Sequence, residues 1–264
     1  MSISLRMHGT CPILRFGERT EGKWRFGIRN CDLGIGGLWP PASPKMVGSA
    51  AVESGTASHR DREKAAVEGL IRLDSDFSII VGKWGLPPRW RRAPGFATLV
   101  HIILEQQVSL ASARAAFDRL AALLEEITPK ALLGLSDLEL LRCGFSRQKT
   151  RYCRALAKDL TEGSLDLESL EKLDDRAACE RLQKVKGIGR WTAEIYLLMA
   201  LGRTDIFPIG DLALVKAIRT LKEMPENPSK ESLQHLAEGW RPWRSTAARL
   251  LWHFYLSGGV PSRA

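Results

Sequence analysis

The sequence predicts an all-α fold for most of this chain of 264 residues. From about Asp61 onward, apolar residues recur with the period of a helix, and no strand pattern is convincing after residue 60. Residues 1–60 differ, because their Gly, Arg, Trp and Cys residues are dispersed without a sustained period and two of their stretches resemble linkers. We therefore expect a disordered or weakly structured extension over residues 1–60, followed by one helical domain over 61–264.

The first helices of this domain are predicted from their apolar faces. Four apolar residues share one face of a first helix: Ala66, Leu70, Leu73 and Phe77. Residues 84–94 contain three prolines and are predicted to form a connector. Residues 96–107 are nearly all apolar before their polar end, which is typical of a buried helix. Ser109 is expected to cap the helix that follows.

The remaining helices follow the same periodicity, with a glycine-rich turn and a short loop between them. The helix expected over 146–160 carries many basic residues, and such a charge run usually marks a solvated face. Helices are expected over residues 129–133, 137–142, 146–160, 176–185, 191–201, 211–221 and 242–256.

Composition restricts the class of partner and the compartment. The net charge of +9 favours a polyanionic partner. The five cysteines have neither zinc nor redox spacing, so free thiols in a reducing compartment are expected. No apolar run approaches ~18 residues, and the N-terminus lacks the apolar core of a secretory signal. We expect an intracellular protein, in the cytoplasm or nucleoid if the host is bacterial.

The stretch LQKVKGIGRWTAE, at residues 182–194, is the most specific motif. Gly187 and Gly189 lack a Cβ, so this turn can adopt positive φ or approach another molecule closely. Backbone N–H groups at the start of a helix converge on an anion. The basic residues Lys184, Lys186 and Arg190 flank the turn, which indicates a nucleic-acid phosphate. The alternative is an ordinary helix–helix turn that ends in glycine.

Asp211 follows Pro208-Ile209-Gly210 and precedes an apolar run. Aspartate directly before a helix is a favoured N-cap, and a carboxylate in such a loop can also be catalytic. The spacing alone leaves both roles open.

The chain resembles the helix-hairpin-helix base-excision DNA glycosylase superfamily, through LQKVKGIGRWTAE and the later FPIGDLALVKAI. Within that superfamily, ILEQQVS at residues 103–109 and WRPWRSTAARLLW at 240–252 are similar to the 3-methyladenine (alkylated-base) DNA glycosylases. The resemblance covers roughly residues 62–257, with the four motifs in the family's order.

The resemblance implies two helical lobes with a DNA-binding cleft between them. One lobe would span residues 97–203 and contain the hairpin, and the other would combine 61–96 with 204–264. The implied partner is double-stranded DNA that contains damaged bases. We expect a monomer with no membrane partner.

The resemblance also assigns roles to residues. Asp211 would face the cleft as the catalytic carboxylate. Gln107 falls where the family places the wedge that fills the gap left by an extruded base, and Gln106 is an alternative. Trp191 and Trp252 match aromatic positions of the base pocket, although either could belong to the core. The hairpin would bind DNA phosphate, and its carbonyls could hold a monovalent cation: Lys184, Val185, Lys186, Gly187, Ile188, Gly189 and Arg190.

These roles agree with the chemistry of base removal. A stacked base is inaccessible, so it must be flipped out of the duplex. Breaking the N-glycosidic bond creates oxocarbenium character on the sugar, which a carboxylate stabilises. An alkylated purine is cationic, so it leaves readily and is attracted to an indole face. The reaction therefore needs no strong acid at the base.

Trp191 also separates subclasses of the superfamily. Bifunctional members carry a lysine nucleophile directly after the hairpin arginine, and Trp191 cannot form a Schiff base. Adenine-mismatch members carry an acid where this chain has Ile102, and their usual iron–sulfur cluster is excluded by the cysteine positions. The histidines form no recognisable metal-binding set, so neither a cofactor nor a catalytic metal is expected.

The predicted function is therefore a monofunctional DNA-3-methyladenine glycosylase of base excision repair, which leaves an abasic site. The pocket tyrosine of some relatives is replaced by Ile195, beside Tyr196, so the range of lesions stays open. The same fold could act on uracil, mismatched or deaminated bases. A non-catalytic helix-hairpin-helix DNA-binding protein is the other alternative.

Overall fold

The computed structural model describes residues 59–261, and these form helices joined by turns and loops, with no strand within that range. This confirms the predicted all-α class for the described part of the chain. Nearly all of the predicted extension over 1–60 lies outside the described residues. No helix between residues 59 and 261 is long and apolar enough to cross a membrane.

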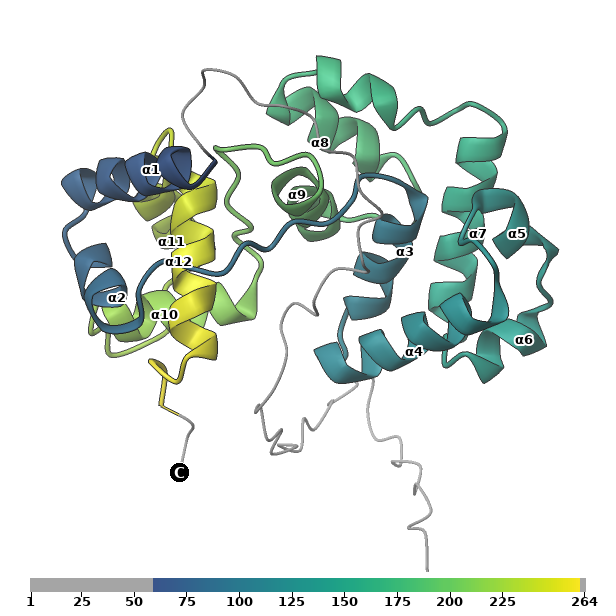
Figure 1. Ribbon diagram of the computed structural model, residues 1–264, viewed down its shortest axis with the longest axis horizontal. Coiled ribbons are helices and arrows are strands. Elements are labelled where there is room, and N and C mark those ends of the chain that lie inside the picture. Colours follow the sequence, from purple (N-terminus) through teal and green to yellow (C-terminus); the bar gives the residue numbers. More distant parts are fainter. Residues whose placement is uncertain (1–58, 262–264) are drawn as a thin grey trace, which may run out of the picture. The chain divides into compact units, whose positions relative to one another are not determined.

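One group of helices packs around α12 (Arg244–Leu256), which contacts α1 (His59–Leu73), α2 (Phe77–Trp84) and α10 (Leu212–Leu221) (Figure 1). The inner faces are apolar, and most side chains of α12 are buried. α11 (Lys230–Glu238) lies between α10 and α12 in the chain. The packing of α10 on α12 brings the start of α10 close to the indole of Trp252.

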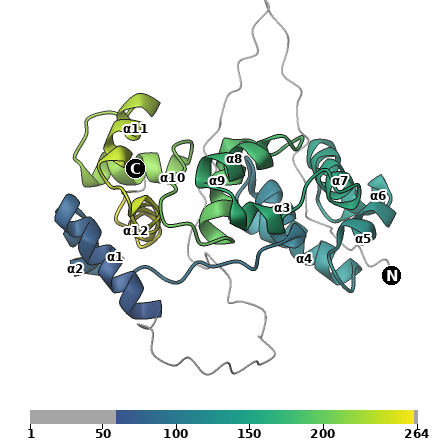
Figure 2. The same ribbon diagram turned by 90° about the horizontal axis from the view of Figure 1, so that it is seen from above.

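A second group of helices surrounds α3 (Phe96–Glu105), which contacts three other helices of this group. α9 (Arg190–Met199) packs against both α3 and α8 (Figure 2). Its residues from Thr192 to Met199 are all buried. The buried face therefore fixes the position of the hairpin that precedes α9. The other members are α4 (Leu110–Leu123), α5 (Pro129–Gly134), α6 (Asp137–Arg142), α7 (Arg147–Thr161), the 3-10 helix η1 (Glu168–Lys172) and α8 (Asp175–Gln183).

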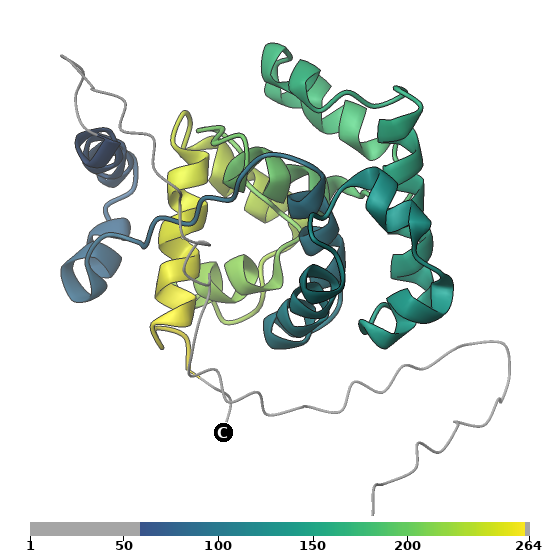
Figure 3. The ribbon, with the colours of Figure 1, turned by 45° about the vertical axis from the view of Figure 1, so that its right-hand side comes forward.

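An extended connector, residues 85–95, leaves α2, passes α12 and reaches α3 (Figures 1 and 3). The Arg92 N–H group donates to the Met199 carbonyl at 2.9 Å, and its guanidinium binds both oxygens of Glu105 at 2.8 and 3.2 Å. The Gly95 N–H group donates to the Tyr196 hydroxyl at 3.0 Å. These bonds hold the connector against α3 and α9.

Most predicted helices are present, and the predicted cap at Ser109 is confirmed because its hydroxyl accepts from the Ser112 N–H group. The first predicted helix is wrong at its end, since Phe77 begins a separate helix and Leu73 is 51% exposed. The turn between α1 and α2 is stabilised by Asp74, whose carboxylate binds Lys222 and Trp240 across the fold. The helices α11 and η1 are not among those predicted from the sequence pattern.

The predicted lobe boundaries stay a prediction, because all described residues fall within a single compact unit. The three cysteines in the described range, Cys143, Cys153 and Cys179, are unpaired, and the first two are buried. On the basic helix α7, the guanidinium of Arg154 binds Asp137 and carbonyls near α5, so this charge is structural.

Candidate active site

Asp211 has the capping role that its position suggested, and its catalytic role stays a prediction. It is the N-cap of α10, where one carboxylate oxygen accepts from the N–H groups of Ala213 and Leu214 at 2.9 and 3.1 Å. Two indoles also donate to the carboxylate: Trp252 Nε1 at 3.2 Å to the capping oxygen and Trp191 Nε1 at 3.0 Å to the other. Four N–H groups therefore fix the orientation of this half-buried carboxylate.

The two tryptophans reach Asp211 from different helices. Trp191 lies in the first turn of α9 and is partly exposed, whereas Trp252 lies on α12 and is only 5% exposed. Trp252 packs edge-on against Trp90, with ring centroids 6.3 Å apart. The structure thus brings both predicted aromatic residues to the carboxylate. Trp252 is at the same time a core residue, and its role as a pocket wall stays a prediction.

The hairpin between α8 and α9 needs its two glycines for different reasons. Gly187 has φ of 95°, and a Cβ there would lie 2.1 Å from Cγ of Tyr152. Gly189 is the N-cap of α9 with φ of −85°, and a Cβ on it would meet no atom within 4 Å. Packing inside the protein therefore explains why residue 187 is a glycine, but it does not explain the glycine at 189. The open face at Gly189 allows another molecule to approach the backbone.

The other hairpin residues divide between anchors and exposed cations. The side chains of Val185 and Ile188 are buried, and those of Lys184 and Lys186 are exposed. No side chain of the described residues caps the start of α9, so within this part of the chain its first N–H groups remain available to an anion. The carbonyl oxygen of Gly187 already accepts one hydrogen bond, from Gln106. Its second lone pair could still bind a cation, so the expected monovalent cation stays a prediction.

Gln106 and Gln107 are neighbours in sequence with opposite environments. The Gln106 amide donates to Gly187 O at 3.0 Å and to the Thr192 hydroxyl at 2.9 Å, so it ties the end of α3 to the hairpin. Gln107 is exposed and has φ of 56°, which is uncommon for a residue with a side chain. This geometry leaves only Gln107 available as a wedge, although the wedge role itself stays a prediction.

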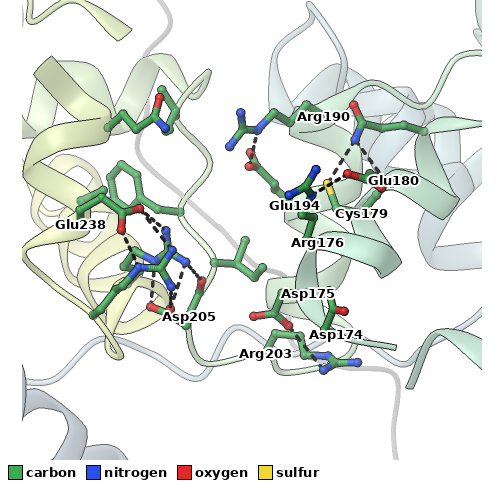
Figure 4. Close-up of a pocket in the computed structure, with 18 residues that line it drawn as sticks. Asp174, Asp175, Arg176, Cys179, Glu180, Arg190, Glu194, Arg203, Asp205 and Glu238 are labelled. Carbon is green, nitrogen blue, oxygen red and sulfur yellow. Dashed lines mark hydrogen bonds and ion pairs between the residues drawn. The ribbon is translucent and has the colours of Figure 1, made fainter. Parts of the chain in front are cut away.

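Arg190 is held by an ion pair with Glu194 one turn later on α9 (Figure 4). Its Nε lies 2.7 Å from Glu194 Oε1, while its side chain remains 62% exposed. Burial raises the pKa of Glu194 above its usual value, and Arg190 opposes this effect. The second oxygen of Glu194 is buried without a partner in the described part of the chain. Glu194 therefore holds the guanidinium of Arg190 in place beside the hairpin.

The cavity beside Arg190, of about 1080 Å³, is not the candidate site (Figure 4). Its walls carry charges that largely pair with each other, such as Asp205 with Arg241 and Arg244. Asp211 and the two tryptophans that bind it do not line this cavity. The site is defined by hydrogen bonds to Asp211 rather than by this cavity.

The sequence did not predict the supporting roles of three residues. Thr192 and Gln106 join the hairpin to α3, and Tyr152 packs against Gly187. None of them has a local signal, because each acts on a residue far away in the sequence. The sequence had indicated Gln106 only as an alternative wedge, not as a residue that binds the hairpin.

The family model described as HhH-GPD superfamily base excision DNA repair protein matches residues 100–242, more than half of the chain. The matched range includes the hairpin and Asp211. The DNA-3-methyladenine glycosylase 1 of Schizosaccharomyces pombe is 30% identical over 178 residues, which cover 66% of this chain and 78% of that protein.

Solved structures of 3-methyladenine DNA glycosylases also superpose with this chain. The 3-methyladenine DNA glycosylase of Schizosaccharomyces pombe in complex with abasic DNA superposes with a TM-score of 0.68 at 27% identity, covering 76% of this chain and 99% of that one. The DNA-3-methyladenine glycosidase of Bacillus halodurans has a TM-score of 0.62 at 30% identity, covering 72% and 88% of the two chains. The chain therefore shares its helical fold with these enzymes.

Proposed function

Because the chain belongs to the HhH-GPD superfamily of base excision DNA repair proteins, we propose that it is a monofunctional DNA glycosylase that removes alkylated purines of the 3-methyladenine type. The observation that carries this proposal is the convergence of Trp191 and Trp252 on the carboxylate of Asp211, beside the hairpin. The similar enzyme from Schizosaccharomyces pombe was solved with abasic DNA, which is the product that base removal leaves.

The proposed reaction is hydrolysis of the bond between C1′ of the sugar and the purine nitrogen. The electrons of this bond leave with the alkylated base, which departs as a neutral molecule because it was cationic before. The carboxylate of Asp211 stabilises the positive charge that develops on the sugar. Water then bonds to C1′, and its proton passes to Asp211 or to solvent. The four N–H donors supply the rigidity that this role requires.

Trp191 supports base removal without strand cleavage. It follows the hairpin arginine, and its indole has no amine that could form a Schiff base with the sugar. Its only polar group is committed to Asp211 at 3.0 Å. The indole face could attract the cationic base by roughly 0.5–2 kcal/mol.

The hairpin and Gln107 support the proposed binding of damaged duplex DNA. Gly189, the uncapped start of α9 and the oriented Arg190 together suit a backbone phosphate. Gln107 projects from the corner between α3 and α4 and could fill the gap left by the extruded base. We further propose that the protein acts inside the cell as a monomer without an organic cofactor or iron–sulfur cluster.

Release of methylated purines from alkylated duplex DNA tests this proposal. The wild type should release 3-methyladenine and leave alkali-labile abasic sites, and Asp211→Asn should lower the rate by about 10²–10⁴-fold. Single-lesion duplexes that contain uracil, hypoxanthine or a mismatch should be poorer substrates. If the wild type releases no base from any of these duplexes, the proposed catalysis is wrong and the alternative of a non-catalytic DNA-binding protein is favoured.

A further inference from the structure

A second cavity, of about 470 Å³, is lined by residues of α1, the connector 85–95, the loop that follows α9, and α12 with the preceding Trp243. We call it the arginine cavity; the charged residues of its walls are Arg62, Glu63, Arg89, Arg91 and Arg249. None of the groups that bind Asp211 lines it. It adjoins the candidate site through Trp90, which lines the cavity and packs against Trp252.

The charges of the arginine cavity are not balanced. Four guanidinium groups face a single carboxylate, that of Glu63. Among the residues that the structure describes, Arg62, Arg89 and Arg91 form no hydrogen bond or ion pair. The cavity near Arg190 is different, because carboxylates there pair with the arginines. The arginine cavity therefore has a surplus of positive charge that no described residue balances.

Arg249 shows the physical cost of this arrangement most clearly. It is half-buried, and its one hydrogen bond to a described residue is a long one, 3.3 Å to Leu198 O. Burial lowers the pKa of Arg249, Glu63 opposes this, and the charges of Arg91 and Arg89 lower it further. A half-buried charge with only one long hydrogen bond is less stable than a paired one, and an anion in the cavity would compensate it.

Trp90 is a second, independent indication of a missing acceptor. The residue is 2% exposed, and its indole Nε1 is buried without a hydrogen-bond partner in the described part of the chain. Buried donors are nearly always paired, because an unpaired one costs the free energy of its desolvation. The residue that carries this uncompensated donor thus contributes to the lining of a cavity that already has excess positive charge.

We propose that the arginine cavity binds a phosphate-bearing ligand of about nucleotide size, separate from the DNA lesion that Asp211 acts on. Guanidinium groups match phosphate oxygens in paired hydrogen bonds, which favours phosphate over a smaller anion. The volume falls in the range of roughly 300–1,000 Å³ that is typical of small-molecule sites and exceeds what one phosphate fills. The nucleotide is either free in solution or one residue of a DNA strand.

The test compares a free nucleotide with DNA on the same set of proteins. The double variant Arg89→Ala/Arg91→Ala removes two exposed charges of the cavity. The control Lys158→Ala/Arg176→Ala removes two exposed charges on α7 and α8 that belong to neither site. Arg249→Gln is a second cavity variant. Calorimetry with ADP at constant ionic strength, and binding to duplex DNA with an abasic site, are measured for each protein.

If the ligand is a free nucleotide, ADP should bind the wild type and the control equally. Binding to both cavity variants should be at least ten-fold weaker, with unchanged affinity for DNA. ADP at ten times its Kd should raise Tm of the wild type by about 3 °C or more. If the ligand is instead a residue of a DNA strand, the DNA affinity of the cavity variants should be at least ten-fold lower than that of the control. Equal behaviour of cavity variants and control toward both ADP and DNA would overturn the proposal.

Discussion

At the scale of single residues, Asp211 has a structural role and a proposed chemical role that use the same two oxygens. One oxygen caps α10 and accepts from Trp252, and the other accepts from Trp191. The cap and the indoles hold the carboxylate in one orientation before any substrate arrives. A variant of this residue therefore has to be examined for stability and activity separately.

Replacing Asp211 with Asn should separate these roles. The amide oxygen can keep the cap, because Asn is as good an N-cap as Asp. The amide nitrogen would then meet the Trp191 N–H group as a second donor, which should cost about 1–2 kcal/mol in the free energy of unfolding. Urea denaturation measures this cost, and base release from alkylated DNA should fall by about 10²–10⁴-fold. A folded variant that retains most of the wild-type rate would refute the chemical role.

Gln107 carries backbone strain at the exposed corner between α3 and α4. Glycine there would relieve about 1 kcal/mol of strain and lose a similar amount through the entropy of the unfolded chain. Gln107→Gly and Gln107→Ala should therefore both fold, and both should lose about ten-fold in excision from duplex DNA. Single-stranded alkylated DNA is the control, because it has no gap to fill and its excision should not change. An equal loss on both substrates would argue against a wedge.

At the scale of secondary-structure elements, the turn between α8 and α9 is held by contacts with other helices at Gly187 and faces open space at Gly189. Tyr152 of α7 covers Gly187, and Gln106 binds its carbonyl, so two other helices determine the conformation of the turn. The start of α9 faces open space at Gly189. This asymmetry makes the two glycines a matched pair for mutation.

Gly187→Ala should destabilise the fold by about 2–4 kcal/mol, since positive φ and the clash with Tyr152 both oppose it. Gly189→Ala should change stability by less than about 1 kcal/mol. The second variant should nevertheless bind DNA about ten-fold more weakly, because its methyl group occupies the space that a phosphate would need. Thermal denaturation and a DNA titration measure the two effects. Normal DNA binding by Gly189→Ala would show that this face is not used.

The turn between α1 and α2 joins distant elements through Asp74. Burial would raise the pKa of this carboxyl, but hydrogen bonds from Lys222 and Trp240, with the charge of Lys222, bring it below its usual value. Because the folded pKa is the lower one, the stabilisation is complete above the unfolded value of 3.8 and is lost as pH falls through the folded pKa.

Asp74→Asn should therefore destabilise the protein at pH 7 by more than at pH 3. Comparison of urea unfolding for the two proteins at both pH values measures this difference. Asp118→Asn is the control, because that carboxylate forms only an exposed ion pair on α4. A pH-independent difference between wild type and Asp74→Asn would contradict the ion pair with Lys222.

At the scale of the whole molecule, the net charge of +9 favours DNA over other partners, but only some cations are expected to contact it. Lys184 and Lys186 flank the hairpin and are exposed, whereas Arg154 and Arg203 bind carbonyl groups and carboxylates of their own chain. Net charge alone therefore overstates the number of DNA phosphates that the protein neutralises.

Lys184→Ala and Lys186→Ala should each reduce the slope of log K against log salt concentration by about 0.9, because each variant would neutralise one DNA phosphate fewer. Fluorescence anisotropy with duplex DNA at several salt concentrations measures the slope. Arg176→Ala, an exposed arginine paired with Glu180, should leave it unchanged. Equal slopes for all three variants would show that the hairpin lysines do not bind phosphate.

The sequence by itself determined the all-α class, most helix positions, the hairpin and the cap at Asp211. These features depend on local periodicity, glycine and capping residues, which act over a few neighbouring positions. Local signals failed at Leu73, because the turn at Asp74 depends on Lys222 and Trp240 from the far end of the chain. They also gave no indication that Gln106 binds the hairpin.

Only the tertiary structure decided how these features combine. Packing of α9 and α12 brings two indoles from distant positions onto one carboxylate, and no sequence period encodes a contact between three separate segments. The same holds for the arginine cavity, whose charges come from α1, the connector and α12. Electrostatic interactions depend on distance in space, and side chains far apart in the sequence acquire that distance only when the helices pack.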